Sequence, residues 1–351
     1  MYRPPRASLQ TASGLQVTVH SRLSDALVQG WRALWRRCPN ATVFTHPDWV
    51  MSWLKQAPTH GAPYFVCVFA RTELIGLAPL TRCAAAYERA DLRLVGGEPF
   101  DYRDVLALPN CADAVAEAFL AALAHPILPW RHATFSHLPA NSALLRAQCP
   151  PQLHCTRTPQ DVCPYLPLPP TADALEQMLP AGCRQRLHRA RRKARSAGNC
   201  TTQVLPMSKT DTGLRVLFDL HTARWRVRGE PGVLFDPSKQ RFLRRASLAL
   251  ATAGLLRLLE VRLNGHPIAA LQAFRSHRRW LLYISGIDPR FARLSPGWLA
   301  LGAAAEKAVA DGAYELDFLR GAETYKYAWG ARNRWTHTLE LAHAHTAVRG
   351  K

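Results

Sequence analysis

The stretch 281–329 constrains the fold most, because it reads as a strand, a loop, a helix and a second strand. Residues 281–287 are β-branched, aliphatic and aromatic over the length of a strand, and the proline that follows cannot donate to a ladder. Residues 298–310 are rich in alanine and favour a helix, and residues 314–318 alternate as a second strand does. This order predicts a βαβ unit with a parallel strand pair.

The start of this predicted helix has the features of an anion site. Ser295 is placed to act as the N-cap and Pro296 occupies the first helical position, where its missing N–H costs nothing. The free N–H groups and the dipole of a helix start attract anions. Arg290 and Arg293 precede the start, and Gly297 lets a ligand approach the backbone. An ordinary capped helix with surface arginines is the alternative.

The charge of the chain points to anionic partners. The net charge of +20 favours nucleic acid, anionic lipid, acidic carrier proteins or phosphorylated cofactors. The densest run, residues 183–197, carries seven cations and no acidic residue, so we expect a helix whose charge excludes it from a core. It predicts a face for phosphate or for an acidic carrier protein, with a solvated surface helix as the alternative. It holds no aromatic residue, which argues against single-stranded nucleic acid. The cations are Arg184, Arg186, Arg189, Arg191, Arg192, Lys193 and Arg195.

The nine cysteines form no CxxC pair. Cys149, Cys155 and Cys163 with His154 come nearest to a metal cluster, but their spacing fits no zinc template. We therefore expect reduced, partly buried thiols and no metal.

With 351 residues the chain is long enough for two domains. We expect a disordered leader over residues 1–14, an N-terminal domain over 15–165 and a C-terminal domain over 166–351. An irregular, proline-rich linker is expected to end near residue 168. No apolar run reaches the roughly 18 residues of a membrane span, and the N-terminus lacks the apolar region of a secretory signal. A cytoplasmic location follows, with peripheral association at an inner membrane as a further possibility.

The first half alternates predicted strands and helices. His46 and Asp48 suggest an acid–base pair, but capping of the next helix by Thr45 or Asp48 is the favoured interpretation. Residues 100–104 form an acidic and aromatic loop. The predicted strands are 15–19, 64–70, 74–80, 92–95, 105–108 and 133–138, and the predicted helices are 25–37, 49–56 and 112–124.

The second half predicts helices before an antiparallel meander. Asn264-Gly265 is a strong hairpin signal between two strands. The meander leads into the βαβ unit, so the fold class is α+β, layered, with a mixed and mostly antiparallel sheet flanked by helices. The predicted helices are 171–179, 183–197, 214–226 and 239–252, and the strands are 255–263, 267–274 and 279–287.

Together these motifs resemble the GNAT acyltransferase superfamily, and within it the bacterial CelD-like family of cellulose biosynthesis, with a distant likeness to FemAB-type aminoacyl transferases. The resemblance covers almost the whole chain. The residues that carry it are Leu220-His221-Thr222-Ala223-Arg224-Trp225 with Gly229, Leu263-Asn264-Gly265 with Ala269-Ala270, Gly286-Ile287-Asp288-Pro289, Ser295-Pro296-Gly297, and Leu316-Asp317-Phe318-Leu319-Arg320-Gly321 with Glu323, Tyr325-Lys326 and Trp329; the basic helix and Phe44-Thr45 to Trp49 recur in that family too.

The resemblance implies tandem GNAT-like domains, with a degenerate N-terminal half and the acyl-donor site in the C-terminal half. It places the donor's pyrophosphate at Ser295 and Gly297, beside Arg290, Arg293 and Trp298. The usual Gln/Arg-x-x-Gly-x-Gly/Ala loop is here Arg293-Leu-Ser-Pro-Gly-Trp. Acetyl-CoA or a longer acyl-CoA, an acyl carrier protein and aminoacyl-tRNA therefore remain open as donors.

The chemistry implied is attack of an amine on an activated acyl carbonyl, which needs a base, an acid and stabilisation of the oxyanion. Asp317 and Glu323 are candidate bases, Lys326 is a candidate for stabilising negative charge, and Tyr325 is a candidate acid. The substrate-binding candidates are Trp225, Asp288 and Arg320, of which Asp288 is also a weaker candidate base. A structural role is the alternative for each, for example Asp317 as the partner of Arg320.

Two functions of different classes follow. The first is an N-acyltransferase that acts on an amine of a small molecule or saccharide, in envelope polysaccharide biosynthesis or a small-molecule pathway. The second is a non-catalytic interaction protein that docks through its basic surface on a synthase complex, a membrane face or RNA. A tRNA-dependent aminoacyl transferase lies between them.

Overall fold

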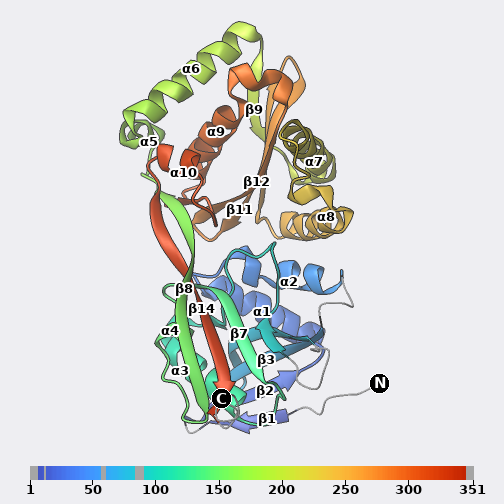
Figure 1. Ribbon diagram of the computed structural model, residues 1–351, viewed down its shortest axis with the longest axis vertical. Helices are drawn as coiled ribbons and strands as arrows, with labels where there is room; N and C mark the ends of the chain where they lie inside the picture. Colours follow the sequence, from blue (N-terminus) through green and yellow to red (C-terminus); the bar gives the residue numbers. More distant parts are fainter. Residues whose placement is uncertain (1–6, 12, 57–60, 84–90, 345–351) are drawn as a thin grey trace. The chain divides into compact units, whose positions relative to one another are not determined.

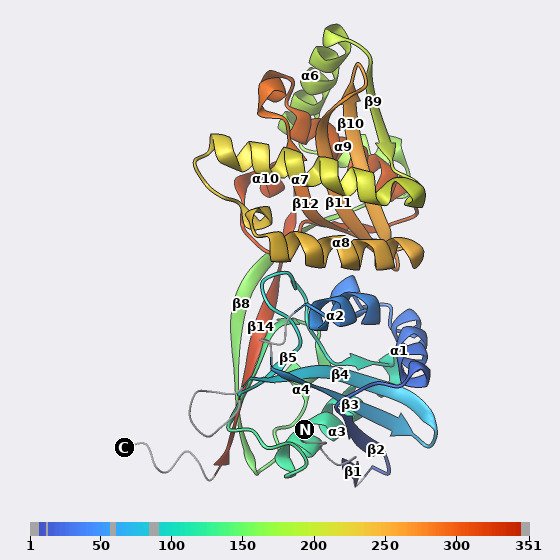
Figure 2. The same cartoon turned by 90° about the vertical axis from the view of Figure 1, so that its right-hand side faces the viewer.

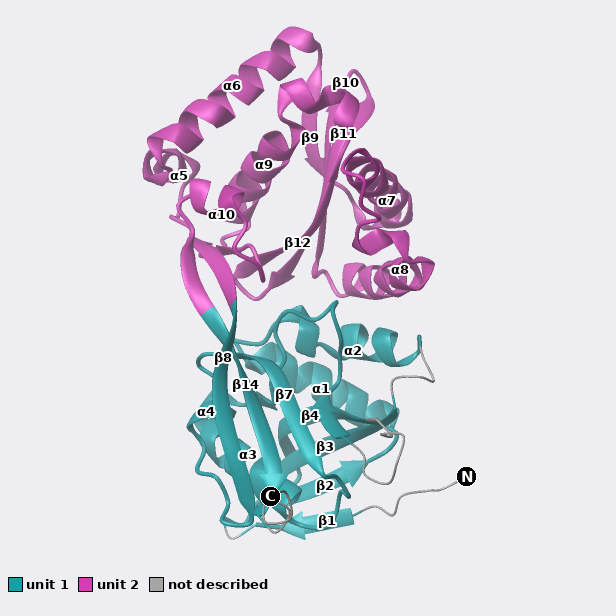
Figure 3. Cartoon of the chain, in the orientation of Figure 1, with its two compact units in different colours: residues 1–161, 335–351 teal, residues 162–334 magenta. Residues whose placement is uncertain are grey.

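The computed structural model describes residues 7–11, 13–56, 61–83 and 91–344. The chain divides into two compact units (Figure 3). Unit 1 comprises Met1–Asp161 with Trp335–Lys351, and unit 2 comprises Val162–Arg334. Each unit is a mixed sheet flanked by helices, so the predicted fold class is confirmed. The boundary between the units falls between residues 161 and 162, whereas the predicted boundary lay between residues 165 and 166. The last segment, Trp335–Lys351, belongs to unit 1.

The sheet of unit 1 runs in the order β1-β2-β3-β4-β5-β7-β14-β8, with β6 beside β4. Its described pairs are antiparallel except β5 and β7, which pair in parallel at Leu92↔Ala133 and Arg93↔Thr134. Figure 2 shows α1 and α2 on one face of this sheet and α3 on the other. The elements are β1 (Ala7–Gln10), β2 (Gln16–His20), α1 (Asp25–Arg37), η1 (Val43–Thr45), α2 (Pro47–Leu54), β3 (Ala62–Ala70), β4 (Glu73–Cys83), β5 (Asp91–Leu94), β6 (Leu106–Ala107), η3 (Pro109–Cys111), α3 (Ala112–Ala124), β7 (His132–Pro139), α4 (Ala143–Arg146) and β8 (Leu153–Pro167).

The sheet of unit 2 runs β9-β10-β11-β12-β13, followed by the last residues of β8. Helices α7 and α8 cover one face, and α9 covers the other with α5 and α6 beyond it (Figure 1). The elements are α5 (Ala172–Met178), α6 (Ala181–Ala197), β9 (Cys200–Val204), η4 (Met207–Lys209), α7 (Thr210–Val227), η5 (Val233–Phe235), α8 (Pro237–Thr252), β10 (Leu256–Leu263), β11 (His266–Ser276), β12 (Arg279–Ile287), η6 (Pro289–Leu294), α9 (Pro296–Ala310), β13 (Glu315–Asp317), α10 (Thr324–Ala328) and β14 (Arg332–His343).

The predicted βαβ unit is confirmed. Strands β12 and β13 pair in parallel from Arg279↔Glu315 to Leu281↔Asp317, and α9 connects them. Pro296 is the first residue of α9, as predicted. Ser295 occupies the N-cap position, as predicted, but its backbone is left-handed at φ 56° and its side chain makes no capping hydrogen bond.

The two units repeat one order of elements. In the first repeat of the chain the order is β2, α1, α2, β3, β4, β5, α3, β7, α4 and β8; in the second repeat it is β9, α7, α8, β10, β11, β12, α9, β13, α10 and β14. The last strand of each repeat pairs in the other unit. Tyr165–Pro167 at the end of β8 pair with β13, and Thr336–Ala342 of β14 pair with β7. The tandem arrangement is therefore built into the pairing of the strands.

Several predicted elements were wrong or missed. Within the expected disordered leader 1–14, Ala7–Gln10 form β1 and pair with β2, while residues 1–6 and 12 lie outside the described part. The segment expected to be an irregular linker is largely β8, and β9, α10 and β14 were not predicted. The cap of α2 is His46, whose Nδ1 accepts from the N–H of Asp48, rather than Thr45 or Asp48.

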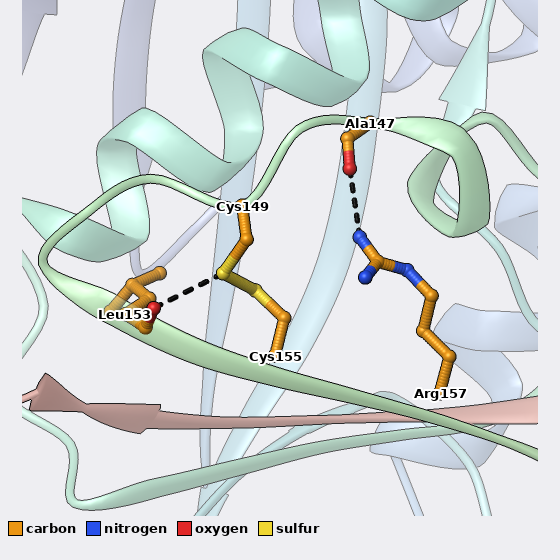
Figure 4. Close-up of a disulfide and its surroundings, with 5 residues drawn as sticks. All are labelled: Ala147, Cys149, Leu153, Cys155 and Arg157. Carbon is orange, nitrogen blue, oxygen red and sulfur yellow. Dashed lines mark hydrogen bonds between the residues drawn. A yellow bond between two sulfur atoms is a disulfide. The ribbon is translucent and has the colours of Figure 1, made fainter.

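Two of the cysteines form a disulfide, so the expectation of reduced thiols is wrong for them. Cys149 and Cys155 are joined across the turn that leads into β8 (Figure 4). Sγ of Cys149 also lies 3.2 Å from the carbonyl oxygen of Leu153, a contact without a donated hydrogen because that sulfur is bonded to its partner. Arg157 donates to the carbonyl oxygen of Ala147 at 2.7 Å nearby, which ties the strand to the preceding segment.

One stripe of helix α6 is buried in the core, which corrects the prediction that the charge of residues 183–197 excludes the helix from a core. Cys183, Leu187, Ala190 and Ala194 form a buried stripe at helical spacing, and α6 packs with it against α9. A Cβ on Gly302 of α9 would lie 2.6 Å from a methyl group of Leu187, so this glycine allows the close approach. The basic side chains occupy the rest of the helix surface.

In the described part of the chain, no helix combines the length and the apolar character that crossing a membrane requires.

Candidate functional site in unit 2

The two parallel strands of unit 2 diverge after a short pairing. The pairing ends at Leu281↔Asp317, yet β12 continues to Ile287. Tyr283 is an extra residue in β12, because its neighbours Leu282 and Ile284 face successive residues of β11. The edge of β12 after Leu281 therefore faces no described strand on the β13 side. In open sheets, ligands bind at the carboxyl ends of parallel strands, where such a gap forms.

Helix α7 closes one side of this region and brings His221 to it. A Cβ on Gly286 would lie 2.4 Å from the backbone nitrogen of His221, so only glycine permits this contact between β12 and α7. His221 is 2% exposed, and burial lowers its pKa to about 4, with the cation of Arg224 adding to the shift. The ring is therefore neutral at pH 7. Its Nδ1 has no hydrogen-bond partner among the described residues.

Arg224 lies one turn further along α7. Burial lowers the pKa of its guanidinium, and the neighbouring cation of Arg228 lowers it further, whereas Tyr325 acts in the opposite direction. Its Nε is buried and unpaired within the described part of the chain. A buried donor without a partner is unfavourable unless a ligand or water satisfies it.

Tyr325 reaches α7 from α10. Its ring packs edge-on against Phe318, with 6.3 Å between the centroids. Burial of the phenol raises its pKa to about 12, the carboxylate of Glu323 adds to the rise, and Arg224 opposes it. The hydroxyl is therefore protonated at neutral pH and can donate a proton, as the role predicted for it requires.

Lys326 and Glu323 hold the loop before α10. Nζ of Lys326 donates to the carbonyl oxygens of Leu319, Arg320 and Gly321 at 3.2, 2.7 and 2.9 Å. It also pairs with Oε2 of Glu323 at 2.8 Å and is 2% exposed. Its donors are thus occupied, which favours a structural role over the predicted catalytic one.

Asp317 stands at the end of β13 and is fully buried. Its Oδ1 accepts from the N–H of Leu319 at 2.8 Å, and Leu319 is left-handed at φ 58°. The carboxylate therefore stabilises the turn that directs the chain away from β12. This geometry favours the structural alternative for Asp317 over its role as a base.

Asp288 and Arg290 bind each other. Asp288 caps η6, accepts from the backbone and side chain of Arg290, and lies 3.1 Å from Nε2 of His266. The hydrogen bonds from Arg290 hold the pKa of Asp288 at about 2. Neither group is presented to the β12 edge as a free charge.

The start of α9 offers fewer N–H groups than a usual helix. Pro296 has none, and the N–H groups of Trp298 and Leu299 both point to the carbonyl oxygen of Ser295 at 2.9 and 3.3 Å. A Cβ on Gly297 would meet only Ile287, at 3.9 Å, so the backbone there is open. The exposed Arg293 and the amine of Lys193, which donates to the Arg293 carbonyl, lie beside it. These groups are the ones that fit an anion.

The remaining predicted residues have identifiable neighbours. Trp298 stacks on Trp329 with 5.3 Å between the rings, and the guanidinium of Arg186 lies above it. Trp225 packs against His221 and beneath Arg228, so it lines the same region as the candidate site. The carbonyl of Arg320 accepts from Lys326, as described above. Among the described residues, no group of three or more His, Cys, Asp or Glu side chains could hold a metal.

One region therefore contains three of the predicted site residues, Tyr325, Glu323 and Trp225. It also contains His221 and Arg224, two residues that were not predicted to belong to the site. His221 had a signal in the sequence, since it falls beside Leu217 and Leu220 on the inward face of its helix. Its unpaired nitrogen depends on packing against Gly286, which no spacing along the chain reveals.

This mixed sheet, its diverging parallel pair and the helix between those strands are the GNAT fold. Residues 181–327 match the family described as "Acetyltransferase (GNAT) domain", and this part of the chain is a GNAT domain.

Solved structures show the same fold over most of the chain. FemX aligns at 10% identity and a TM-score of 0.66, covering 91% of this chain and 96% of FemX. A conserved protein of unknown function from Bacteroides thetaiotaomicron aligns at 11% identity and a TM-score of 0.57, covering 91% of this chain and 98% of that one. The C-terminal domain of a putative lysylphosphatidylglycerol synthetase from Agrobacterium fabrum aligns at 10% identity and a TM-score of 0.56, covering 92% and 94%. No curated protein matches the chain.

Proposed function

We propose that unit 2 is an N-acyltransferase that moves an acyl group from a thioester donor to an amine. The observation that carries the proposal is the unpaired edge of β12, flanked by His221, Arg224 and Tyr325, within the segment that matches the GNAT family. Acetyl-CoA, a longer acyl-CoA and an acyl carrier protein share the thioester chemistry. An amine of a small molecule or saccharide, for example in CelD-like polysaccharide biosynthesis, is the proposed acceptor.

The donor fits along the free edge of β12. Amide groups of a pantetheine arm can pair with the unused backbone groups of that edge, as an added strand would. Its phosphates would then meet the open N–H of Gly297 with the cations Arg293 and Lys193. Arg290 is less available for this role, because its side chain already makes hydrogen bonds to Asp288 through Nε and Nη2. Of the residues predicted to bind the donor's pyrophosphate, Arg293 and Gly297 therefore remain the best placed.

The bonds and protons of the reaction balance with the groups at the site and solvent water. The neutral amine attacks the thioester carbonyl carbon, and a C–N bond forms as the C–S bond breaks. The leaving thiolate takes the proton of the Tyr325 hydroxyl, which is then restored from solvent. Nδ1 of His221 is uncharged and accepts a hydrogen bond from the attacking amine, whose proton passes to solvent. We assign these roles to Tyr325 and His221 in place of Lys326 and Asp317.

The test is release of free thiol from acyl-CoA in the presence of a panel of amines, including amino sugars. Tyr325→Phe should lower kcat/KM at least about 100-fold, the lower range for a lost general acid. Tyr327→Phe is the matched control, because it removes the same hydroxyl from the same helix at a residue about as exposed as Tyr325, while Arg224 interacts with Tyr325. Equal rates for the two variants, or no thiol release with any amine, would contradict the proposal.

One observation on α6 favours a second class of donor, an anionic macromolecule. Arg189, Arg192 and Arg195 are exposed and have no ion-pair partner among the described residues, and a hollow lined by Arg192 and Arg195 also includes His188 and Arg191. Such a face fits an anionic macromolecular donor, either an acyl carrier protein or an aminoacyl-tRNA. Replacing Arg192 and Arg195 by Gln should raise KM for such a donor and leave turnover of acyl-CoA unchanged. Gln at Arg241 and Arg245, exposed on α8, is the control.

A further inference from the structure

Unit 1 contains an open cavity that the proposed acyl transfer does not use. Its volume is about 350 Å³, and all the residues that line it belong to unit 1. We infer that this cavity is a second binding site, which takes a small zwitterion of the α-amino acid type. Asp104 would hold the ligand's ammonium group, and Arg146 at the rim would attract its carboxylate.

The cavity occupies the place in unit 1 that the candidate active site occupies in unit 2. Its walls are the segment after α1, the segment between β5 and α3, and the segment between β7 and β8. The corresponding segments of unit 2 follow α7, β12 and β13, and they surround Trp225 and Tyr325. The repeat has therefore kept a ligand-sized space in unit 1 while the side chains around it have changed.

Asp104 offers the cavity one carboxylate oxygen. Oδ1 accepts from the N–H of Val105 at 2.8 Å and from the hydroxyl of Ser142 at 2.7 Å. Within the described part of the chain, nothing donates to Oδ2. A ligand ammonium is a donor with three hydrogens and a positive charge, and it would satisfy this oxygen.

Thr42 adds an unsatisfied hydroxyl to the same cavity. The residue is 4% exposed, and its Oγ1 has no hydrogen-bond partner among the described residues. Its carbonyl, by contrast, accepts from Nε1 of Trp35 and from the hydroxyl of Thr45. Since buried hydroxyls are nearly always bonded, the orphan on the cavity wall points to a polar ligand rather than an apolar one.

The charges that face the cavity are mixed, which is why we infer a zwitterion. Arg103 and Arg146 line it together with Asp104, and Asp113 binds Arg146 at 2.7 Å. Arg146 lowers the pKa of Asp104, but burial dominates and raises that pKa to about 7. Cys38 and Tyr102 are the other titratable residues that line the cavity. Burial raises the pKa of the Cys38 thiol to about 12, so it stays neutral.

Binding of an ammonium should therefore depend on pH. Asp104 must be ionised to attract the cation, and its ionised fraction rises about ten-fold between pH 6 and pH 8 for a pKa of about 7. The affinity for an amino acid should rise by up to the same factor over that range. Ligands without a charged amine should show no such rise.

The experiment is isothermal titration of the full chain with the common L-amino acids at pH 6, 7 and 8. Each binder is compared with its N-acetyl and its carboxamide derivative, which remove the ammonium and the carboxylate in turn. We expect one or more amino acids to bind, both derivatives to bind at least ten-fold more weakly, and Asp104→Asn to abolish the pH dependence. Thr42→Val should weaken binding several-fold without affecting the pH dependence, and Glu117→Gln, exposed on α3 outside the cavity, should change nothing.

Three outcomes would overturn the inference. They are failure of every amino acid to bind the wild-type chain, equal binding of a free amino acid and its N-acetyl derivative, and unchanged binding in folded Asp104→Asn. If Asp104→Asn does not fold, the derivatives and Thr42→Val decide the question. Because Tyr325 plays no part in this site, thiol release by unit 2 can fail or succeed independently of the result.

Discussion

Units 1 and 2 share an order of elements, but they differ in the cation carried by the short helix after the second parallel strand. In unit 2, Lys326 of α10 is buried and donates to the three preceding carbonyls. In unit 1, Arg146 of α4 donates to the carbonyls of Asn141 and Ser142 but remains exposed at its outer end. Both units thus place a cation in the short helix at the same point of the repeat. The cation is buried beside the candidate active site in unit 2 and exposed beside the cavity in unit 1.

The difference shows which parts of a repeat can change. The strands, the helix between them and the cation that ties the loop serve the fold, and both units keep them. The groups facing the open space differ: unit 2 places neutral His221 and protonated Tyr325 there, whereas unit 1 places Asp104 and Thr42. We therefore expect separate chemistry on a shared scaffold.

The largest expected effect comes from removing the buried cation. Lys326→Met leaves three carbonyl oxygens without their donor and should lower the free energy of unfolding by about 3 kcal/mol. Arg146→Met removes an exposed cation and should cost under about 1 kcal/mol. Urea unfolding followed by fluorescence measures both, and equal costs would contradict the contrast between the units.

The change with pH in the free energy of unfolding that Asp104 of unit 1 causes should be nearly as large as the effect of Lys326→Met. The pKa of Asp104 rises from 3.8 to about 7 on folding, so between these values the folded state holds a proton that the unfolded state has lost. Stability from the neutral carboxyl is full below pH 3.8 and is lost as the pH rises through 7, by up to a few kcal/mol. Asp104→Asn should remove that loss. The difference between wild type and variant, measured at pH 5 and pH 8, checks it; a difference independent of pH would contradict it.

A third expectation concerns the contact that positions His221. Gly286→Ala places a methyl group within 2.4 Å of the His221 backbone nitrogen and should cost about 1–3 kcal/mol. Gly182→Ala is the control, since a Cβ there, in the first turn of α6, meets nothing within 4 Å, and it should be neutral or stabilising by up to about 1 kcal/mol. Thermal unfolding separates the two, and a tolerated Gly286→Ala would mean that β12 and α7 are not packed so closely.

The smallest effect is expected on the basic face of α6. Replacing Arg192 and Arg195 by Gln should change the free energy of unfolding by less than about 0.5 kcal/mol, because both side chains are exposed. Any larger change in folded-state stability would show that these arginines have structural partners. The same variants then report on donor binding without a loss of fold.

Much of the fold follows from local patterns. The limits of α1 were predicted at Asp25–Arg37, because its apolar spacing repeats with helical period. β8 was missed because Pro164 and Pro167 read as linker residues. In the structure the carbonyl oxygen of Pro164 accepts from the N–H of Phe318, and the N–H of Leu168, just after Pro167, donates to the carbonyl oxygen of Tyr314. Proline is thus tolerated where the pairing uses carbonyls and flanking amides.

The candidate site was less accessible from sequence. Tyr325 could be singled out by the motif around it, and its hydroxyl carries its proton at neutral pH, as an acid must. Asp317 and Lys326 were chosen by the same reasoning, but local geometry ties both to the turn at Leu319. The disulfide between Cys149 and Cys155 depends on the turn that leads into β8. It was missed because β8 itself was not predicted.

The most direct test of the central claim, that unit 2 holds the acyl donor, is a thermal-shift titration with acetyl-CoA and longer acyl-CoAs at low and high salt. Gly297→Glu adds a negative charge at the start of α9, and Ala112→Glu adds the same charge at the start of α3, its counterpart in unit 1. We predict saturable stabilisation of the wild-type chain that survives high salt, is lost in Gly297→Glu and is kept in Ala112→Glu. No saturable shift in the wild-type chain, or equal shifts in the two variants, would contradict the claim.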